Sequence, residues 1–92
     1  MIRSFGDKRT EALFRDAIVR EFQSIARRAK RKLEALHAAN ELNDLAVPPS
    51  NRLEKLKGNL TRYHSIRIND QWRVIFVWRD GDAFEVAIVD YH

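Results

Sequence analysis

The last three residues, Asp90, Tyr91 and His92, place a carboxylate, a phenol and an imidazole next to one another. These groups can transfer protons. An imidazole in an RNA-cleaving site can take the proton from a ribose 2′-OH or give one to the leaving 5′-oxygen. A frayed chain end with a half-buried tyrosine is the alternative interpretation. We therefore treat all three as candidate catalytic residues.

Arg73 follows Trp72 at the start of a segment filled with apolar residues. Because successive side chains of a strand point to opposite faces, Arg73 must leave the face that carries Trp72 and Val74. If helices cover that face, the guanidinium lies on the other side of the sheet, where it can hold a phosphate and stabilise transition-state charge. A structural salt bridge to Asp90 or Glu85 is an equally good explanation.

Lys57 lies in the segment Leu56-Lys57-Gly58-Asn59, where the glycine leaves room for the lysine to approach a phosphate. The competing interpretation is an ordinary turn, because glycine is common in turns. Lys57 is therefore a candidate phosphate-binding residue of the same site.

A ridge of cations is expected on the long helix predicted below. The basic ridge consists of Arg27, Arg28, Lys30 and Arg31, opposite an apolar face of Ile25, Ala29, Leu33 and Leu36. Such a row can follow an RNA backbone, because phosphate contacts depend on charge density more than on exact base geometry. Lys55 and Arg67 are further candidates for RNA contacts. For each residue taken singly, a solvated helix face is the alternative.

The bulk composition favours one folded domain with an anionic partner. The 92 residues suffice for one domain, 1–92, and the 17 Lys and Arg against 13 Asp and Glu favour nucleic acid. The chain has no cysteine, and its three histidines show no close ligand spacing, so we expect no metal or other cofactor. No apolar targeting or membrane-spanning segment is visible, so we expect a cytoplasmic protein.

The first half of the chain is predicted to be helical after a short strand over 2–5. Asp7 is a suitable N-cap for a helix that begins near Lys8. Apolar residues recur every three or four positions over 22–38, which indicates an amphipathic helix. Between residues 16 and 24 the pattern is interrupted by β-branched residues, so a break or bend is expected there.

The second half is predicted to form strands. A short turn over 40–45 and the helix-ending Pro48-Pro49, expected to impose an extended connector, precede a short strand over 52–56. Three longer strands follow, over 63–68, 72–78 and 84–89, with turn residues between them. An antiparallel meander is the simple arrangement. The order of elements predicts an α+β domain with two helices packed on one face of a mainly antiparallel sheet.

The order of elements and several segments together resemble the HigB branch of the RelE-like toxins. These segments are Met1–Phe5, Leu56–Asn59, Tyr63–Ile68, Asn69–Phe76 and Asp90–His92, so the resemblance covers essentially the whole chain. It implies a RelE-like fold and ribosome-dependent cleavage of mRNA in the A site. It also implies neutralisation by a HigA-type antitoxin with a helix-turn-helix domain. The complex of the two would repress its own operon, so operator DNA would be contacted only through that complex.

The family pattern carries over to Lys57, Arg73, Asp90, Tyr91 and His92. By this resemblance, Lys57 and Arg73 stabilise phosphate charge. His92 leads proton transfer, and Asp90 and Tyr91 position His92 or the nucleotide.

Glu54 departs from the pattern, because some relatives have a histidine here. An ionised carboxylate can act as a general base but cannot donate the proton that an imidazolium can. Glu54 therefore either shares proton transfer with His92 or is a surface residue paired with Lys55 or Lys57.

Two functions fit these observations. The first is a metal-independent mRNA endonuclease, in which the 2′-OH attacks the adjacent phosphate and leaves a 2′,3′-cyclic phosphate. The second is a non-catalytic module that binds ribosomal RNA through the basic ridge or serves as an antitoxin-binding corepressor. Cleavage of a reporter mRNA by purified ribosomes plus the protein separates them.

Overall fold

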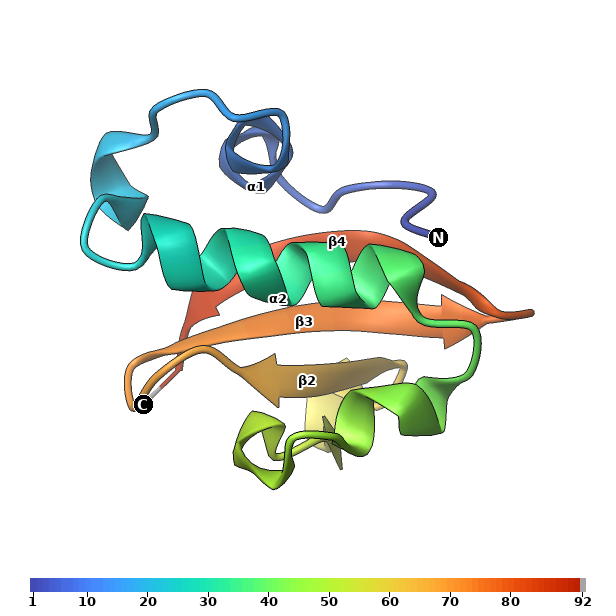
Figure 1. Ribbon diagram of the computed structural model, residues 1–92. Coiled ribbons are helices and arrows are strands. Elements are labelled where there is room, and N and C mark those ends of the chain that lie inside the picture. Colours follow the sequence, from blue (N-terminus) through green and yellow to red (C-terminus); the bar gives the residue numbers. More distant parts are fainter. Residues whose placement is uncertain (92) are drawn as a thin grey trace.

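The computed structural model describes residues 1–91, which form two α-helices over a four-stranded antiparallel sheet (Figure 1). The helices are α1 (Lys8–Phe14) and α2 (Ala26–Ala38), and the strands are β1 (Glu54–Lys55), β2 (Tyr63–Arg67), β3 (Trp72–Arg79) and β4 (Asp82–Asp90). Short 3₁₀ turns are η1 (Arg20–Phe22), η2 (Leu42–Ala46), η3 (Pro49–Asn51) and η4 (Gly58–Leu60). The strand order β1-β2-β3-β4 confirms the predicted meander and the α+β class.

Helix α1 begins as predicted, because the Asp7 carboxylate accepts a hydrogen bond from the Thr10 amide at 2.7 Å. The buried Thr10 hydroxyl in turn accepts from the Ile88 amide at 2.9 Å, which ties α1 to β4. Beyond the helix, Asp16 has a φ of 69°, and the chain reaches α2 through a loop and η1. The predicted break is confirmed, and the long helix starts at Ala26 rather than at residue 22.

The main hydrophobic core lies between α2 and the sheet (Figure 1). Helix α2 buries Ala29, Leu33 and Leu36. The sheet side of this core includes Ile66, Val74, Phe76, Val86 and Ile88. Fully burying each of the larger side chains contributes about 1.5–3 kcal/mol, so this layer fixes which sheet face the helices cover.

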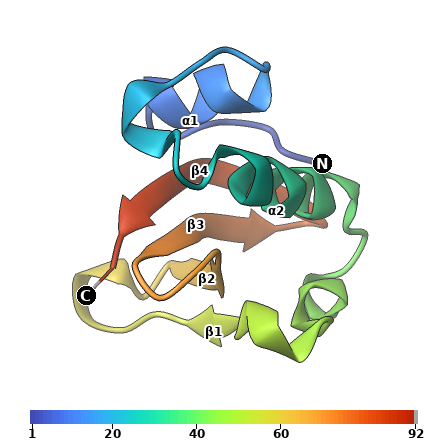
Figure 2. The same cartoon turned by 60° about the vertical axis from the view of Figure 1, so that its left-hand side comes forward.

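The opposite sheet face, here called the open face, carries a smaller apolar cluster. Leu56, Ile75 and Ala87 are buried in it, and Tyr63 and Val89 pack against them. Both helices lie on the other side of the sheet, as Figure 2 shows. Polar side chains of the open face can therefore meet a partner molecule.

The N-terminal segment runs beside β4 but forms two isolated parallel bridges, Ile2 to Ala83 and Phe5 to Val86, in place of the regular strand expected over 2–5. The ladder is interrupted because Glu85 adopts a φ of 54° between the two bridges. Gly6 allows the close approach, since a Cβ there would lie 2.9 Å from the Glu85 carbonyl oxygen.

Several predicted bounds shift in the second half of the chain. The strand expected over 52–56 contracts to β1, whereas β3 and β4 extend farther than predicted. The prolines do not impose a fully extended connector, because Pro48 is extended but Pro49 begins η3. Within residues 1–91, no helix is long and apolar enough to cross a membrane.

Candidate active site

Arg73 lies on the open face, as the alternation along β3 predicts. Its Nη1 donates a hydrogen bond to Ser65 Oγ at 3.2 Å and lies 3.5 Å from Glu54 Oε1. Its guanidinium carbon lies 4.9 Å from the centre of the Tyr91 ring. Only 13% of the Arg73 side chain is exposed, so three neighbours hold a largely buried cation in one orientation.

The sheet register explains why these residues meet. Strand β2 lies between β1 and β3, with Glu54 opposite Ser65 and Arg67 opposite Arg73. Directly opposed residues project to the same face, so Glu54, Ser65 and Arg73 share the open face. Ser65 is fully buried and fills the position between the carboxylate and the guanidinium.

Arg73 and Glu54 pair with each other, a partnership that the sequence did not predict for either residue. Glu85 instead pairs with Arg62 at 2.6 Å and accepts a hydrogen bond from the Tyr63 hydroxyl at 2.9 Å. Burial and this bond to Glu85 raise the pKa of Tyr63 above its ordinary value. Glu85 is thus bound at another part of the open face.

A cleft of about 330 Å³ adjoins this cluster. The catalytic cleft, as we call it, is lined by Glu54, Lys55, Leu56, Lys57, Leu60 and Tyr91. Lys57 precedes η4, and Gly58 follows with a φ of 66° and open space around the position of a Cβ. The predicted candidates Glu54, Lys57 and Tyr91 therefore come together beside Arg73, and Lys55 joins them.

Asp90 and Tyr91 take different directions at the end of β4. Asp90 is opposite Trp72 in the register, one position away from the Arg73–Val89 row, so it projects to the other face. Its carboxylate accepts a hydrogen bond from Gln71 Nε2 at 3.0 Å. Asp90 is therefore on the opposite sheet face from Arg73, whereas the Tyr91 ring lies against the Arg73 guanidinium. His92 lies outside the described residues.

The basic ridge is exposed at Arg27, Arg28 and Arg31. Lys30 does not belong to this exposed row, because its ammonium donates to the Phe14 carbonyl and pairs with Asp16 at 2.9 Å. It lies 4.9 Å from the centre of the Phe14 ring and fastens α2 to the end of α1. Lys30 therefore turns to the α1 side of the helix.

Sequence reasoning missed two residues near these cations. Ser65 is a small polar residue two positions before Arg67 on the same strand, but its contact with Arg73 depends on the register. Lys32 lies on α2 between the buried and exposed faces and hydrogen-bonds Asn51, which is distant in sequence. No sequence pattern signals the second contact.

Among residues 1–91, no three His, Asp or Glu side chains gather closely enough to hold a metal ion. The groups assembled at the catalytic cleft are a carboxylate, a phenol and three cations, Lys55, Lys57 and Arg73. Such a set can bind a phosphodiester and accept a proton.

Solved structures identify the class of the fold. A Staphylococcus aureus YoeB–YefM toxin–antitoxin complex contains a chain that aligns with all of this one and 98% of itself, at a TM-score of 0.63 and 24% identity. The YoeB dimer from the same organism covers 99% of this chain and 97% of its own, at a TM-score of 0.56 and 23% identity. The fold is therefore that of the RelE-like toxins.

Sequence comparison then gives the family. Residues 3–92 match the model of the RelE-like toxin of type II toxin–antitoxin system HigB. Toxin HigB-1 of Vibrio cholerae serotype O1 is 45% identical over 90 residues, which cover 96% of this chain and 95% of that protein. Endoribonuclease HigB of Proteus vulgaris is 31% identical over the full length of both chains. The chain belongs to the HigB family of RelE-like toxins of type II toxin–antitoxin systems, proteins that act with an antitoxin partner.

Proposed function

We propose that the chain is a ribosome-dependent endoribonuclease that cuts mRNA and thereby inhibits translation and growth. The endoribonuclease class follows from membership in the HigB family and from the full-length relative that is named an endoribonuclease. The observation that carries the mechanism is the immobilised Arg73, held by Glu54, Ser65 and Tyr91 beside the catalytic cleft.

In the proposed reaction, the ribose 2′-oxygen attacks the adjacent phosphorus while the bond from phosphorus to the 5′-oxygen breaks. A base accepts the 2′-OH proton, and an acid gives a proton to the leaving 5′-oxygen. The products are a 2′,3′-cyclic phosphate and a 5′-hydroxyl. The charge that develops on the phosphate oxygens is stabilised by Arg73 and Lys57, which is the role that fixed cations perform best in a partly dehydrated site.

His92 is the leading proton-transfer group of this proposal, and Glu54 shares the work as a base. Tyr91 holds the Arg73 guanidinium against its ring face, which supports the orientation of that cation. Asp90 would be a positioning residue, since its carboxylate accepts a hydrogen bond from Gln71 at the β2–β3 turn. Lys55 and the exposed basic residues of α2 supply RNA contacts.

The partners of the proposal are the ribosome, mRNA and a HigA-type antitoxin with a helix-turn-helix domain. Operator DNA is bound through the toxin–antitoxin complex, and the compartment is the cytoplasm. The support for an antitoxin lies in the toxin–antitoxin family itself.

The test is cleavage of a reporter mRNA by purified ribosomes and the protein, with the new ends identified by mass spectrometry. Ends carrying 2′,3′-cyclic phosphate and 5′-hydroxyl are expected with the parent protein, and none with Arg73→Gln. Arg79→Gln is the matched control, because Arg79 is an exposed arginine at the far end of the same strand. Ribosome binding without cleavage by the parent would support the non-catalytic module instead.

A further inference from the structure

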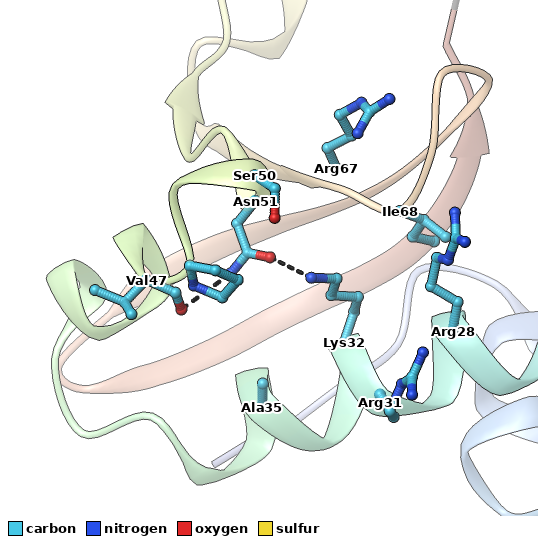
Figure 3. Close-up of a pocket in the computed structure, with 10 residues that line it drawn as sticks. Arg28, Arg31, Lys32, Ala35, Val47, Ser50, Asn51, Arg67 and Ile68 are labelled. Carbon is cyan, nitrogen blue, oxygen red and sulfur yellow. Dashed lines mark hydrogen bonds between the residues drawn. The ribbon is translucent and has the colours of Figure 1, made fainter.

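A second cleft, of about 370 Å³, lies between α2 and the segment that leads into β1 (Figure 3). Four cations line this α2 cleft: Arg28, Arg31, Lys32 and Arg67. Among the described residues, no acidic side chain lines it, and its remaining wall includes Ala35, Val47, Pro48 and Ile68. The cleft thus combines a concentration of positive charge with an apolar side.

Lys32 is held at the cleft by a buried polar residue. Its ammonium donates a hydrogen bond to the Asn51 side-chain oxygen, as Figure 3 shows. Asn51 is 2% exposed, and its amide nitrogen donates to the carbonyls of Leu45 at 3.1 Å and Val47 at 3.3 Å. Both ends of the Asn51 amide are therefore engaged, which fixes the lysine head group against the wall of the cleft.

The cations of the cleft repel one another. Partial burial, together with the charges of Arg31, Arg28 and Arg67, lowers the pKa of Lys32. Within the described residues, the carboxylate nearest this set is that of Asp70, which pairs with Arg67 and is almost fully exposed. An anion that entered the α2 cleft would relieve this repulsion, because opposite charge stabilises each of the protonated forms.

The cleft continues along the helix. A neighbouring hollow is lined by Gln23, Ser24, Ile25, Ala26, Arg27, Arg28, Arg31 and Asn69, so the two hollows share Arg28 and Arg31. At about 1.5 Å of rise per helical residue, the cations from Arg27 to Lys32 extend over about 7.5 Å. A row of cations of this length can contact consecutive phosphates of one strand, because phosphate contacts depend on charge density more than on exact geometry.

The α2 cleft also adjoins the candidate active site. Arg67 lines the cleft and is directly opposite Arg73 in the sheet register. Directly opposed Cβ atoms in an antiparallel pair are about 4.5–5.5 Å apart, so Arg67, which shares the open face with Arg73, is the residue through which the α2 cleft meets the candidate active site. A polyanion with repeated charges would contact the cations of the α2 cleft and Arg73 together, whereas a single carboxylate would contact only some of them.

We propose that the α2 cleft binds successive backbone phosphates of RNA and, with Lys32 as its fixed cation, supplies a second anchoring site beside the catalytic cleft. The proposal deepens the proposed function on which it rests, because the RNA is that of the ribosome or of the mRNA bound to it. The apolar wall would contact a ribose or a base of the same strand.

The test measures binding to purified ribosomes as a function of salt, with and without bound mRNA. Two variants remove charge at the cleft: the double variant Arg28→Gln/Arg31→Gln, and Lys32→Gln, which keeps a donor for Asn51. Each lost phosphate contact should reduce the slope of log affinity against log salt by about 1, so the double variant should lose about 2. Arg15→Gln/Arg79→Gln is the matched control, with two exposed arginines far from the cleft and an expected parental slope.

The outcomes separate this proposal from the catalytic one. The proposed role of the cleft would be overturned if both cleft variants, with unchanged thermal unfolding, had the ribosome affinity and salt dependence of the parent. This outcome does not depend on whether the parent cuts mRNA. Loss of antitoxin affinity without loss of ribosome affinity would also overturn it and identify the cleft as an acidic-peptide site. If the cleft variants bind the ribosome more weakly than the parent, and the parent itself never cuts mRNA, the cleft proposal is supported and the endonuclease is refuted. If the variants lose ribosome affinity only when mRNA is bound, the RNA in the α2 cleft is mRNA. If they lose affinity equally with and without mRNA, it is ribosomal RNA.

Discussion

Glu54 Oε1 lies 3.5 Å from Arg73 Nη1, across the width of β2. This ion pair joins the residue that departs from the family pattern to the cation that the pattern predicts. A phosphate that binds Arg73 would approach the same guanidinium and therefore meet the Glu54 carboxylate. The pair places a potential base next to the group that would hold the scissile phosphate.

Glu54→Gln tests that base directly. Gln has nearly the same shape but cannot accept the 2′-OH proton, so the single-turnover rate of mRNA cleavage should fall by about 10²-fold or more. The free energy of unfolding should change by less than about 1 kcal/mol, because Glu54 is half exposed and the ion pair is weak. Glu11→Gln, at another exposed ion pair, is the control. An unchanged rate would leave Glu54 with a purely electrostatic role.

Arg73→Lys should slow cleavage although it keeps the charge. A lysine ammonium cannot make the planar pair of hydrogen bonds that a guanidinium offers to Ser65 and a phosphate. Loss of one preorganised donor to the transition state costs about 10²–10³-fold in the single-turnover rate. The measurement compares Arg73→Lys, Arg73→Gln and the control Arg79→Lys on the same ribosomes. Parental cleavage by Arg73→Lys would show that charge without geometry suffices.

The sequence was sufficient to predict the elements whose cause is local. The Asp7 cap, the break after Asp16 and the three long strands each follow from residues within a few positions of one another. Alternation along β3 alone placed Arg73 on the face without helices. These predictions hold because side-chain periodicity decides which face is buried.

Contacts that depend on register or long-range packing could not be predicted in the same way. The Glu54–Arg73 pair requires β1, β2 and β3 to align, and Asp90 leaves the cluster because its row in the sheet is that of Trp72. Helical periodicity predicts Lys30 to be part of the exposed basic ridge. In the fold, its ammonium instead bonds to Phe14 and Asp16 at the end of α1. The α2 cleft likewise joins residues from three separate segments of the chain.

Asp7→Ala should destabilise the fold without touching the cleft. The substitution removes the acceptor for the Thr10 amide at the start of α1, a loss that typically costs about 1 kcal/mol. The midpoint of chemical denaturation should fall, while the slope of the unfolding free energy against denaturant concentration should stay unchanged. Asp7→Asn, which keeps an acceptor oxygen, should recover most of the loss. Equal stability of Asp7→Ala and the parent would mean that water replaces the cap.

His64 should make the protein less stable in mild acid. Its Nδ1 is buried without a hydrogen-bond partner in the described part of the chain, and burial together with the charge of Lys55 lowers the pKa of the imidazole. The unfolded chain therefore binds a proton at higher pH than the folded chain does. Stability from the neutral imidazole is present above about pH 6.5, the ordinary histidine pKa, and is lost as the pH falls below it.

The measurement is the free energy of unfolding from pH 8 to pH 5 for the parent and His64→Phe. Phenylalanine preserves the ring that stacks on Phe76 but does not titrate. The parent should lose more stability than the variant as the pH falls, so the slopes rather than the absolute values are compared. Parallel curves would show that the His64 pKa is the same in the folded and unfolded chains.

His92→Ala should impair chemistry far more than folding. Tyr91, the preceding residue, lines the catalytic cleft and is 41% exposed, and the side chain of a chain end generally contributes little to a core. Loss of a proton-transfer group typically lowers the rate by about 10²–10⁴-fold, whereas the thermal unfolding temperature and ribosome affinity should stay close to those of the parent. Single-turnover cleavage is measured with and without added imidazole, which can take the place of the missing side chain. Partial recovery with imidazole, but not with a salt of equal ionic strength, is the expected sign of proton transfer. Near-parental cleavage by a folded, ribosome-bound His92→Ala protein would refute His92 as the principal acid or base and leave Glu54 as the stronger candidate.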